Sequence, residues 1–354
     1  MPLFKTNNIK ISGLAAAVPK TIYSNKDYDW VPENERDLLI KTIGVQERRI
    51  AAKGTATSDL CFEAAEKLIA ALNWEKESIQ LLIFVSQTFD YQIPSTAIIL
   101  QDRLKLPKST IAFDINLGCS GYVYGLSVVS SLMNTTGIKK ALFLAGDVST
   151  LNASYKDKSA FPLFGDAGTA TALELDDNAQ PMFFNLNSDG SGFDAIYVKD
   201  GGMRNFICDK SFEVKKYGEG IYRNDIQIAL NGIEVFNFGL KEVKPNVIDL
   251  LNYAGKTIDD IDYFVFHQAN KLMNETIRKK IKIPPEKFPY SIEKYGNTSS
   301  ASIPLTMLYK IKNELEENEL DLVLSGFGVG LSWGTVFLKT NKVKCLPIIE
   351  YDDC

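Results

Sequence analysis

The stretch Thr110-Ile-Ala-Phe-Asp-Ile-Asn-Leu-Gly-Cys119-Ser-Gly-Tyr122 changes character near its middle. Its first seven residues are typical of a buried strand that ends just before Gly118. Small and apolar residues then continue from Ser120 to Met133 and predict a central helix that is buried on most sides. A glycine permits the tight turn between the two elements. Cys119 is therefore predicted at the point where a buried strand turns into a buried helix.

Short apolar strands alternate with helical stretches on both sides of this segment. Residues 79–86 and 140–146 predict two further buried strands. This alternation is typical of an α/β fold with a mainly parallel sheet.

A weak internal repeat is also present. Residues 73–87 match the pattern of 255–268, and residues 141–147 resemble 320–326. We therefore expect two similar α/β halves, at 1–175 and 176–354, with an irregular cap or insertion around 192–222. Chance similarity between apolar strands is the alternative explanation.

Composition excludes several classes of protein. A net charge of −5 argues against a nucleic-acid binder, which normally carries a basic surplus. No run of 18 apolar residues predicts a membrane span, and the first residues do not have the pattern of a signal peptide. The five cysteines are odd in number and never form a C-x-x-C pair, so we expect neither a disulfide framework nor a metal site. The cytoplasm is the expected compartment.

Cys119 is the first candidate for chemistry. The amides and the dipole at a helix N-terminus stabilise a thiolate and are expected to lower the thiol pKa below its free value of about 8.5. The alternative is a small core cysteine, a description that suits Cys61 well.

His267 is the only histidine in the 354 residues. It ends a predicted buried strand, Asp262-Tyr-Phe-Val-Phe-His267, and is followed by Gln-Ala-Asn270. Histidine is the side chain best suited to proton chemistry near neutral pH, although a lone histidine is more often a satisfied core residue. Two more segments carry polar or glycine-rich patterns: the loop around Asn297, and Gly326–Gly334, which leads into a strand and so is no dinucleotide fingerprint.

Cys119, His267 and Asn297 together form a Cys/His/Asn set. A papain-like protease uses these residue types, but the flanking sequences here lack its Cys-Gly-Ser-Cys-Trp string. The chain instead resembles the thiolase superfamily, and it is most similar to β-ketoacyl-acyl-carrier-protein synthase III. The collinear motifs that carry this resemblance are Leu117-Gly-Cys-Ser-Gly, His267-Gln-Ala-Asn270, Tyr295-Gly-Asn-Thr-Ser299 and Gly328-Val-Gly-Leu-Ser-Trp-Gly334. The resemblance covers nearly the whole chain and implies a thiolase-like αβαβα fold of five layers and a homodimer.

The resemblance also implies a role for each residue. Cys119 accepts an acyl group from acyl-CoA or an acyl-carrier protein. The backbone N–H groups of Cys119 and of the Gly328–Val329 turn form the oxyanion hole. His267 and Asn297 donate hydrogen bonds to the thioester carbonyl of malonyl-carrier protein, which loses CO₂ and attacks the acyl-Cys119. No bound cofactor and no metal are implied.

The predicted substrate-binding positions depart from the family pattern. Leu38 and Lys158 stand where the family typically has a Trp and an Arg around the adenine of coenzyme A, and Ile233 replaces an Asn that often contacts pantetheine. Asn270 is retained, and Phe236 lies in a further matching motif. We therefore expect an acyl-carrier protein or an unusual CoA ester as the donor; the alternative is that other residues have taken over CoA binding. Ile93 stands where the family often has a Phe that reaches into the partner's acyl pocket.

A basic run in a predicted helix suits an acidic carrier protein: Arg278, Lys279 and Lys280. A solvated basic face is the plainer interpretation. Two other functions stay open. The acyl group on Cys119 can pass to a hydroxyl or amine of a sugar or secondary metabolite without decarboxylation, or the chain can be an inactive subunit that binds acyl chains or carrier protein.

Overall fold

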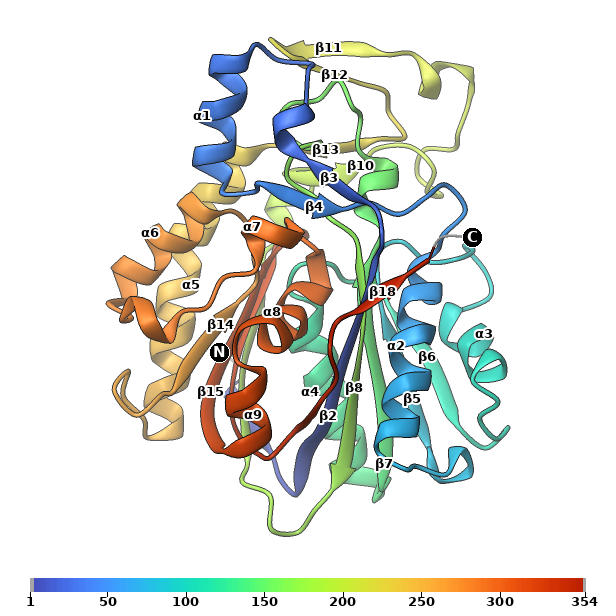
Figure 1. Cartoon of the computed structure of the whole chain (residues 1–354), viewed down its shortest axis with the longest axis vertical. Coiled ribbons are helices and arrows are strands. Elements are labelled where there is room, and N and C mark those ends of the chain that lie inside the picture. Colours follow the sequence, from blue (N-terminus) through green and yellow to red (C-terminus); the bar gives the residue numbers. More distant parts are fainter. Residues whose placement is uncertain (1–2, 353–354) are drawn as a thin grey trace.

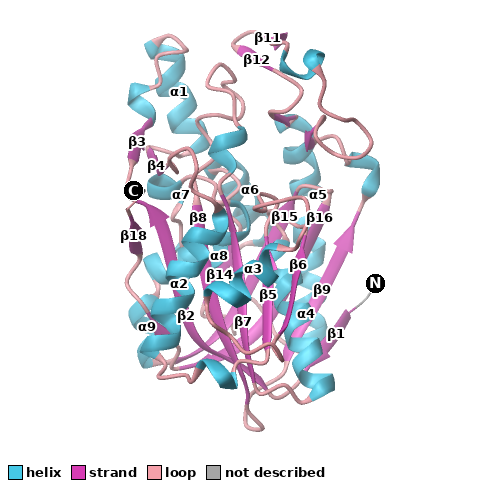
Figure 2. Ribbon diagram, turned by 90° about the vertical axis from the view of Figure 1, so that its right-hand side faces the viewer, coloured by secondary structure: helices cyan, strands magenta, loops and turns pink. Residues whose placement is uncertain are grey.

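The computed structural model describes residues 3–352, and two large sheets form its centre (Figures 1 and 2). The first sheet has the strand order β17-β2-β8-β7-β5-β6, and β18 also pairs with β2. β5 is parallel to β6 and β7, whereas β8 is antiparallel to both β7 and β2. Its strands are β2 (Ile9–Pro19), β5 (Leu81–Val85), β6 (Ile111–Ile115), β7 (Lys140–Asp147), β8 (Ala167–Leu175), β17 (Lys344–Cys345) and β18 (Ile349–Tyr351).

The second sheet repeats this arrangement with the order β1-β9-β16-β15-β14. β14 and β15 are parallel, and β16 is antiparallel to its neighbours β15 and β9. The row β14-β15-β16-β9 therefore has the same order and directions as β5-β7-β8-β2. Its strands are β1 (Leu3–Thr6), β9 (Met182–Ser188), β14 (Tyr263–Phe266), β15 (Glu319–Gly328) and β16 (Ser332–Asn341).

Helices complete five layers in the order αβαβα. α4 and α8 lie between the two sheets and contact strands of both, α2 covers the outer face of the first sheet, and α5 covers that of the second. The fold is therefore thiolase-like, as expected. The helices are α1 (Glu33–Ile43), α2 (Thr57–Ala71), α3 (Thr96–Arg103), α4 (Gly121–Thr136), α5 (Gly232–Ala254), α6 (Lys271–Ile281), α7 (Ile292–Tyr295), α8 (Ser302–Lys310) and α9 (Lys312–Glu317).

The largest core cluster fills the space between the sheets, around α4 and α8. The small residues of α4 let its backbone approach the strands closely. A Cβ at Gly125 would lie 2.5 Å from the Phe143 ring, so no larger residue fits there without movement. This packing fixes α4, and with it the residue that precedes the helix.

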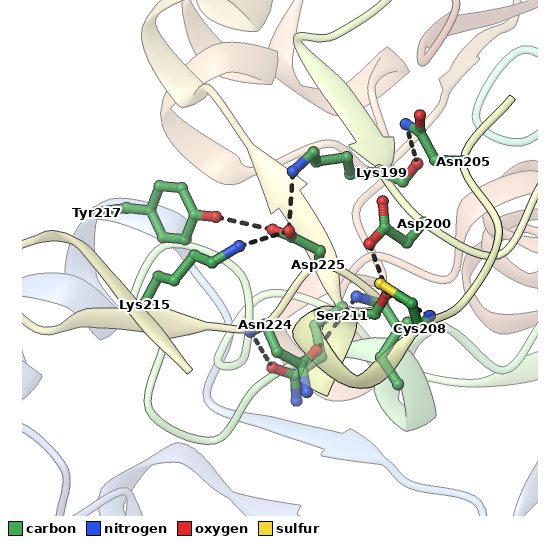
Figure 3. A network of polar contacts seen from close by, with 11 residues as sticks. Lys199, Asp200, Asn205, Cys208, Ser211, Lys215, Tyr217, Asn224 and Asp225 are labelled. Carbon is green, nitrogen blue, oxygen red and sulfur yellow. Dashed lines mark hydrogen bonds and ion pairs between the residues drawn. The ribbon is translucent and has the colours of Figure 1, made fainter. Parts of the chain in front are cut away.

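A cap lies at the top of the molecule in Figure 1 and holds two short ribbons, β10–β13 and β11–β12. Asp225 ties the cap together by accepting hydrogen bonds from Lys199 at 2.8 Å, Lys215 at 2.6 Å and Tyr217 at 3.0 Å (Figure 3). The bonds from Lys199 and Lys215 lower the Asp225 pKa to about 2. The strands of this upper region are β3 (Ile22–Ser24), β4 (Glu47–Arg49), β10 (Ile196–Val198), β11 (Lys215–Gly218), β12 (Ile221–Arg223) and β13 (Ile228–Leu230).

The structure refines two expectations about the fold. Both sheets are mixed rather than mainly parallel, because β8 and β16 each return antiparallel to the strand before them. The expected boundary at 175 falls at the end of β8, but the chain ends cross over: β1 joins the second sheet, and β17 and β18 join the first. A contiguous division at residue 175 therefore does not describe either sheet completely. Within residues 3–352, no helix is long and apolar enough to cross a membrane.

Candidate active site

Cys119 lies in the turn between β6, which ends at Ile115, and α4, which begins at Gly121. The turn is tight: the Gly121 N–H donates to the Gly118 carbonyl at 2.6 Å. A Cβ at Gly118 would lie 2.3 Å from Oε1 of Gln87, so a larger residue before the cysteine would require the Gln87 side chain to move. The predicted strand–turn–helix order around Cys119 matches this local structure, but β6 is a partly exposed strand at the edge of its sheet rather than the buried strand expected.

The protonation of Cys119 differs from the expectation. Burial raises the pKa of its thiol to about 11, and hydrogen bonds from the Val329 backbone and the Ser299 side chain only partly oppose this. The expected lowering was wrong because the side chain is 7% exposed and a thiolate there loses its hydration. The resting side chain is therefore a thiol.

The hairpin between β15 and β16 places its backbone against Sγ of Cys119. Gly328 has a φ of +156°, and a Cβ on it would lie 2.8 Å from Sγ of Cys119. Only glycine allows this close approach. The adjoining Val329 N–H hydrogen-bonds to the Cys119 side chain, so the turn presents a donor beside the nucleophile.

His267 follows the last residue of β14 and is 1% exposed. Its backbone N–H donates to Ser325 of the neighbouring strand β15 at 2.8 Å, and its Nδ1 lies 2.8 Å from the Ser302 hydroxyl. Burial lowers the His267 pKa to about 3, opposed by a hydrogen bond to the Ser299 backbone. The imidazole is therefore neutral at physiological pH. A hydroxyl that donates to Nδ1 would leave Nε2 as the protonated nitrogen.

Asn297 is held by backbone pairing with the segment before β8. Its N–H donates to Leu163 at 2.9 Å, and its carbonyl accepts from Gly165 at 3.0 Å. Its Oδ1 accepts the Ser299 N–H at 2.9 Å, and its Nδ2 makes only a long contact of 3.4 Å to Ala269. The amide is thus oriented with its oxygen engaged and its NH₂ available.

These groups surround one cavity of about 80 Å³. Cys119, His267 and Asn297 all line it, together with Gly328 and Val329. Asn270 lines it as well and caps α6, because its Oδ1 accepts the Met273 N–H at 2.8 Å.

The other predicted substrate-binding residues lie outside this cavity. Leu38 and Ile233 are 64% and 76% exposed, Ile93 is 85% exposed, and Phe236 packs partly buried against the core beneath α5. Lys158 forms an ion pair with Glu35, one turn before Leu38 on α1.

The basic run on α6 is not a continuous exposed patch. Arg278 is 8% exposed, because it forms an ion pair with Glu275 at 2.9 Å and donates to the Ile283 carbonyl. This burial does not favour a docking role for Arg278, and carrier docking by the run stays a prediction. Lys280 donates to the Leu240 carbonyl, and Lys279 is exposed. Both lie at the far end of the helix, roughly 13 Å along its axis from Asn270.

The sequence interpretation missed three residues of this region. Ser299 contacts all three predicted catalytic residues, and Gln87 and Ser149 line the cavity. Gln87 carried a usable signal, since it directly follows a predicted strand in the first copy of the repeat. No cluster of three or more metal-binding side chains occurs in residues 3–352.

A five-layered αβαβα fold with a cysteine at the start of its central helix defines an enzyme of the thiolase class. Family models for 3-oxoacyl-[acyl-carrier-protein] synthase III and for its C-terminal part match residues 113–190 and 251–340. The β-ketoacyl-[acyl-carrier-protein] synthase III of Oceanobacillus iheyensis is 31% identical over 95% of this chain and 100% of its own length. That of Clostridium acetobutylicum is 32% identical with the same coverage.

A solved 3-oxoacyl-(acyl-carrier protein) synthase from Burkholderia xenovorans LB400 is 38% identical, with a TM-score of 0.93 over 99% of both chains. A synthase III from Pseudomonas aeruginosa PAO1 is 26% identical, with a TM-score of 0.83 over 95% of this chain and 99% of its own. The chain belongs to the β-ketoacyl-[acyl-carrier-protein] synthase III family, and it is an acyltransferase of the condensing type.

Proposed function

We propose that the chain transfers an acyl group from a thioester donor to Cys119 and then joins it to malonyl-acyl carrier protein with loss of CO₂. The observation that carries this proposal is the convergence of Cys119, His267 and Asn297 on one cavity, with the Gly328–Val329 backbone against the sulfur.

In the first half-reaction, the sulfur of Cys119 attacks the donor's thioester carbonyl. The backbone N–H groups of Cys119 and of the Gly328–Val329 turn stabilise the oxyanion, and the donor's thiol leaves with the proton that the cysteine gives up. In the second, the malonyl thioester binds with its carbonyl facing His267 and Asn297. Loss of CO₂ leaves an enolate that their N–H groups stabilise. The enolate carbon attacks the acyl-Cys119, and the released sulfur takes up a proton.

The donor we propose is an acyl-carrier protein or an unusual CoA ester. A family-type adenine sandwich is not available from Leu38, an aliphatic side chain, or from Lys158, whose ammonium is paired with Glu35. Loss of one stacking partner costs about 1 kcal/mol. A homodimer and a cytoplasmic location are part of the same proposal; the unpaired state of Cys61, Cys119, Cys208 and Cys345 suits a reducing compartment.

Intact-mass measurement of the purified protein tests the first half-reaction. Wild type and Cys119→Ala are incubated with matched acyl-CoA and acyl-carrier-protein donors. We expect one acyl adduct on wild type, faster from the carrier protein, and none on the variant. Equal rates from both donors would refute the donor assignment, and no adduct from any donor would favour an inactive subunit.

Addition of malonyl-carrier protein to the acylated enzyme tests the second half-reaction. We expect the adduct to disappear as one CO₂ and one β-ketoacyl-carrier protein appear for each acyl group. Loss of the adduct without CO₂ would instead indicate acyl transfer to another acceptor, such as a hydroxyl or an amine.

A further inference from the structure

A second cavity of about 800 Å³ adjoins the one that holds Cys119. The two share the side chains at their junction, which we call the neck: Gln87, Ser149, Ile196, Ile228 and Val329. His267, Asn297 and Asn270 line only the first cavity, so the thioester end of a substrate is held on that side. The acyl chain of an adduct on Cys119 then extends through the neck into the larger space.

Two polar side chains at the neck have unused hydrogen-bonding capacity. The Gln87 carboxamide lies over Gly118, where a Cβ would be 2.3 Å from its Oε1, and the Gln87 N–H is fixed by Asp147 at 2.7 Å. Neither this carboxamide nor the Ser149 hydroxyl makes a hydrogen bond to another residue in the described range 3–352. A saturated alkyl chain at the neck would remove water from both groups and return no hydrogen bond, which is unfavourable.

The charged side chains around the second cavity limit which groups an acyl chain can carry there. The walls of this cavity carry three carboxylates and no Lys or Arg, so an acyl chain that ends in a carboxylate would find no cation there. One oxygen of each carboxylate accepts hydrogen bonds, Asp147 from Ser86, Gln87 and Thr88, Asp90 from Ser58, and Asp200 from Ser211, whereas Oδ2 of Asp147 and Oδ1 of Asp90 have no partner in the described residues. None of these carboxylates belongs to the neck, whose polar side chains are both neutral. A neutral donor–acceptor group, rather than an ammonium, therefore suits the neck.

We propose that the preferred acyl group carries a hydroxyl within its first few carbons, and that Gln87 and Ser149 recognise this hydroxyl. The proposal rests on acylation of Cys119 as proposed above. A hydroxyl both donates and accepts, which matches a carboxamide and a serine hydroxyl on either side of it. Because a polar site discriminates against an analogue that leaves its groups unpaired, a plain acyl chain of equal length should react about tenfold more slowly or worse.

The test compares single-turnover acylation of Cys119 by butyryl, (3R)-hydroxybutyryl, (3S)-hydroxybutyryl and succinyl groups on one carrier protein. Intact mass gives the rate for each donor. We expect one hydroxybutyryl enantiomer to react at least about tenfold faster than butyryl, and succinyl to react slowest. Gln87→Met keeps the length of the side chain and removes the amide, and Ser149→Ala removes the hydroxyl. Each should bring the hydroxybutyryl-to-butyryl ratio towards one, mainly by slowing hydroxybutyryl.

The matched control is Gln180→Met, the same substitution at an exposed position in the turn between β8 and β9, which should leave the ratio unchanged. Thermal melting of each variant separates loss of recognition from loss of folding. If wild type takes butyryl as fast as both hydroxybutyryl donors, or if Gln87→Met and Ser149→Ala both keep the wild-type ratio, the hydroxyl assignment is wrong while acylation itself stands. If no donor forms an adduct, the proposed function fails as well.

Discussion

The buried surroundings of Cys119 and His267 set the protonation state of both side chains. The Cys119 pKa is raised to about 11 and the His267 pKa is lowered to about 3, in each case chiefly by loss of hydration. Transfer of the thiol proton to the imidazole is therefore strongly unfavourable before substrate binds. A thiolate–imidazolium pair of the protease kind does not suit this site, whereas a neutral imidazole that donates a hydrogen bond does.

The first prediction concerns the reactivity of Cys119 with pH. Because its pKa is raised, the thiolate fraction is small at neutral pH and should increase about tenfold per pH unit between pH 6 and 9. The rate of alkylation by iodoacetamide should follow it without reaching a plateau. The measurement belongs in a background with Cys208→Ser and Cys354→Ser, because Cys208 is exposed with a lowered pKa and would react first, and Cys354 lies outside the described residues. A plateau below pH 8 would show that the helix N-terminus overcomes burial.

The second prediction separates the two half-reactions at His267. His267→Ala removes a donor to the malonyl thioester, so decarboxylation should fall by about a hundredfold or more, while acylation of Cys119 falls far less. Release of labelled CO₂ and intact mass measure the two steps separately. Since the His267 pKa is lowered to about 3, wild-type decarboxylation should not change between pH 5 and 8 through titration of this ring. Equal loss of both steps would show that His267 acts in acylation too.

At the residue scale, the sequence identified Cys119, His267 and Asn297 as candidates but not their environment. Residue types and spacing are visible in the chain, so the three positions could be predicted together. The direction of the Cys119 pKa shift depends on how completely the β15–β16 hairpin covers the sulfur, and no local pattern reports that coverage. Ser299 was missed for the same reason, since its contacts come from folding.

The next prediction concerns Asn270, which caps the first turn of α6 and also lines the cavity. A substitution there is therefore expected to affect both stability and substrate binding. The Asn270 Oδ1 caps the helix by accepting the Met273 N–H, and its NH₂ is left to the cavity. Asn270→Ala should lower the free energy of unfolding by about 1 kcal/mol, whereas Asn270→Asp should keep the cap. Both variants should raise the KM of the acyl donor, because both lack the NH₂. Denaturant unfolding and steady-state kinetics measure the two effects. A normal KM for Asn270→Asp would show that Asn270 is only a cap.

Element positions could be predicted well where apolar patterns are long. The strands expected at 79–86, 110–116, 140–146 and 262–267 appear in the structure as β5, β6, β7 and β14, with ends within two residues of those expected. The short strand β1 and the crossing of the chain ends carry no such pattern and were missed. Arg278 shows a different limit of prediction from sequence. A run of basic residues does not reveal that one of its side chains turns inward and pairs with Glu275.

At the scale of the whole molecule, the edge strand β6 has no counterpart beside β14 in the second sheet. The rows β5-β7-β8-β2 and β14-β15-β16-β9 match, but β6 extends the first sheet beyond β5 and ends it at an open edge. Open edges invite pairing with another chain unless they are protected. Exposed apolar side chains lie on this edge and on α3, which packs against it: Ile111 is 48% exposed and Ile98 is 51% exposed.

The last prediction is that two copies pair through β6. A continuous sheet across the dimer would pair the free backbone groups of β6 and bury Ile111 together with Ile98 and Ile93. Wild type should therefore be a homodimer in sedimentation velocity, and Ile111→Lys should shift it to monomer, since a charge on an edge strand blocks pairing. Ile22→Lys is the matched control, because Ile22 is 52% exposed on β3, away from this edge, and should stay dimeric. A monomeric wild type, or a dimer that survives Ile111→Lys, would contradict pairing through β6. Because Ile93 lies on the loop before α3, loss of the dimer should also slow acylation of Cys119 if the partner completes the acyl site.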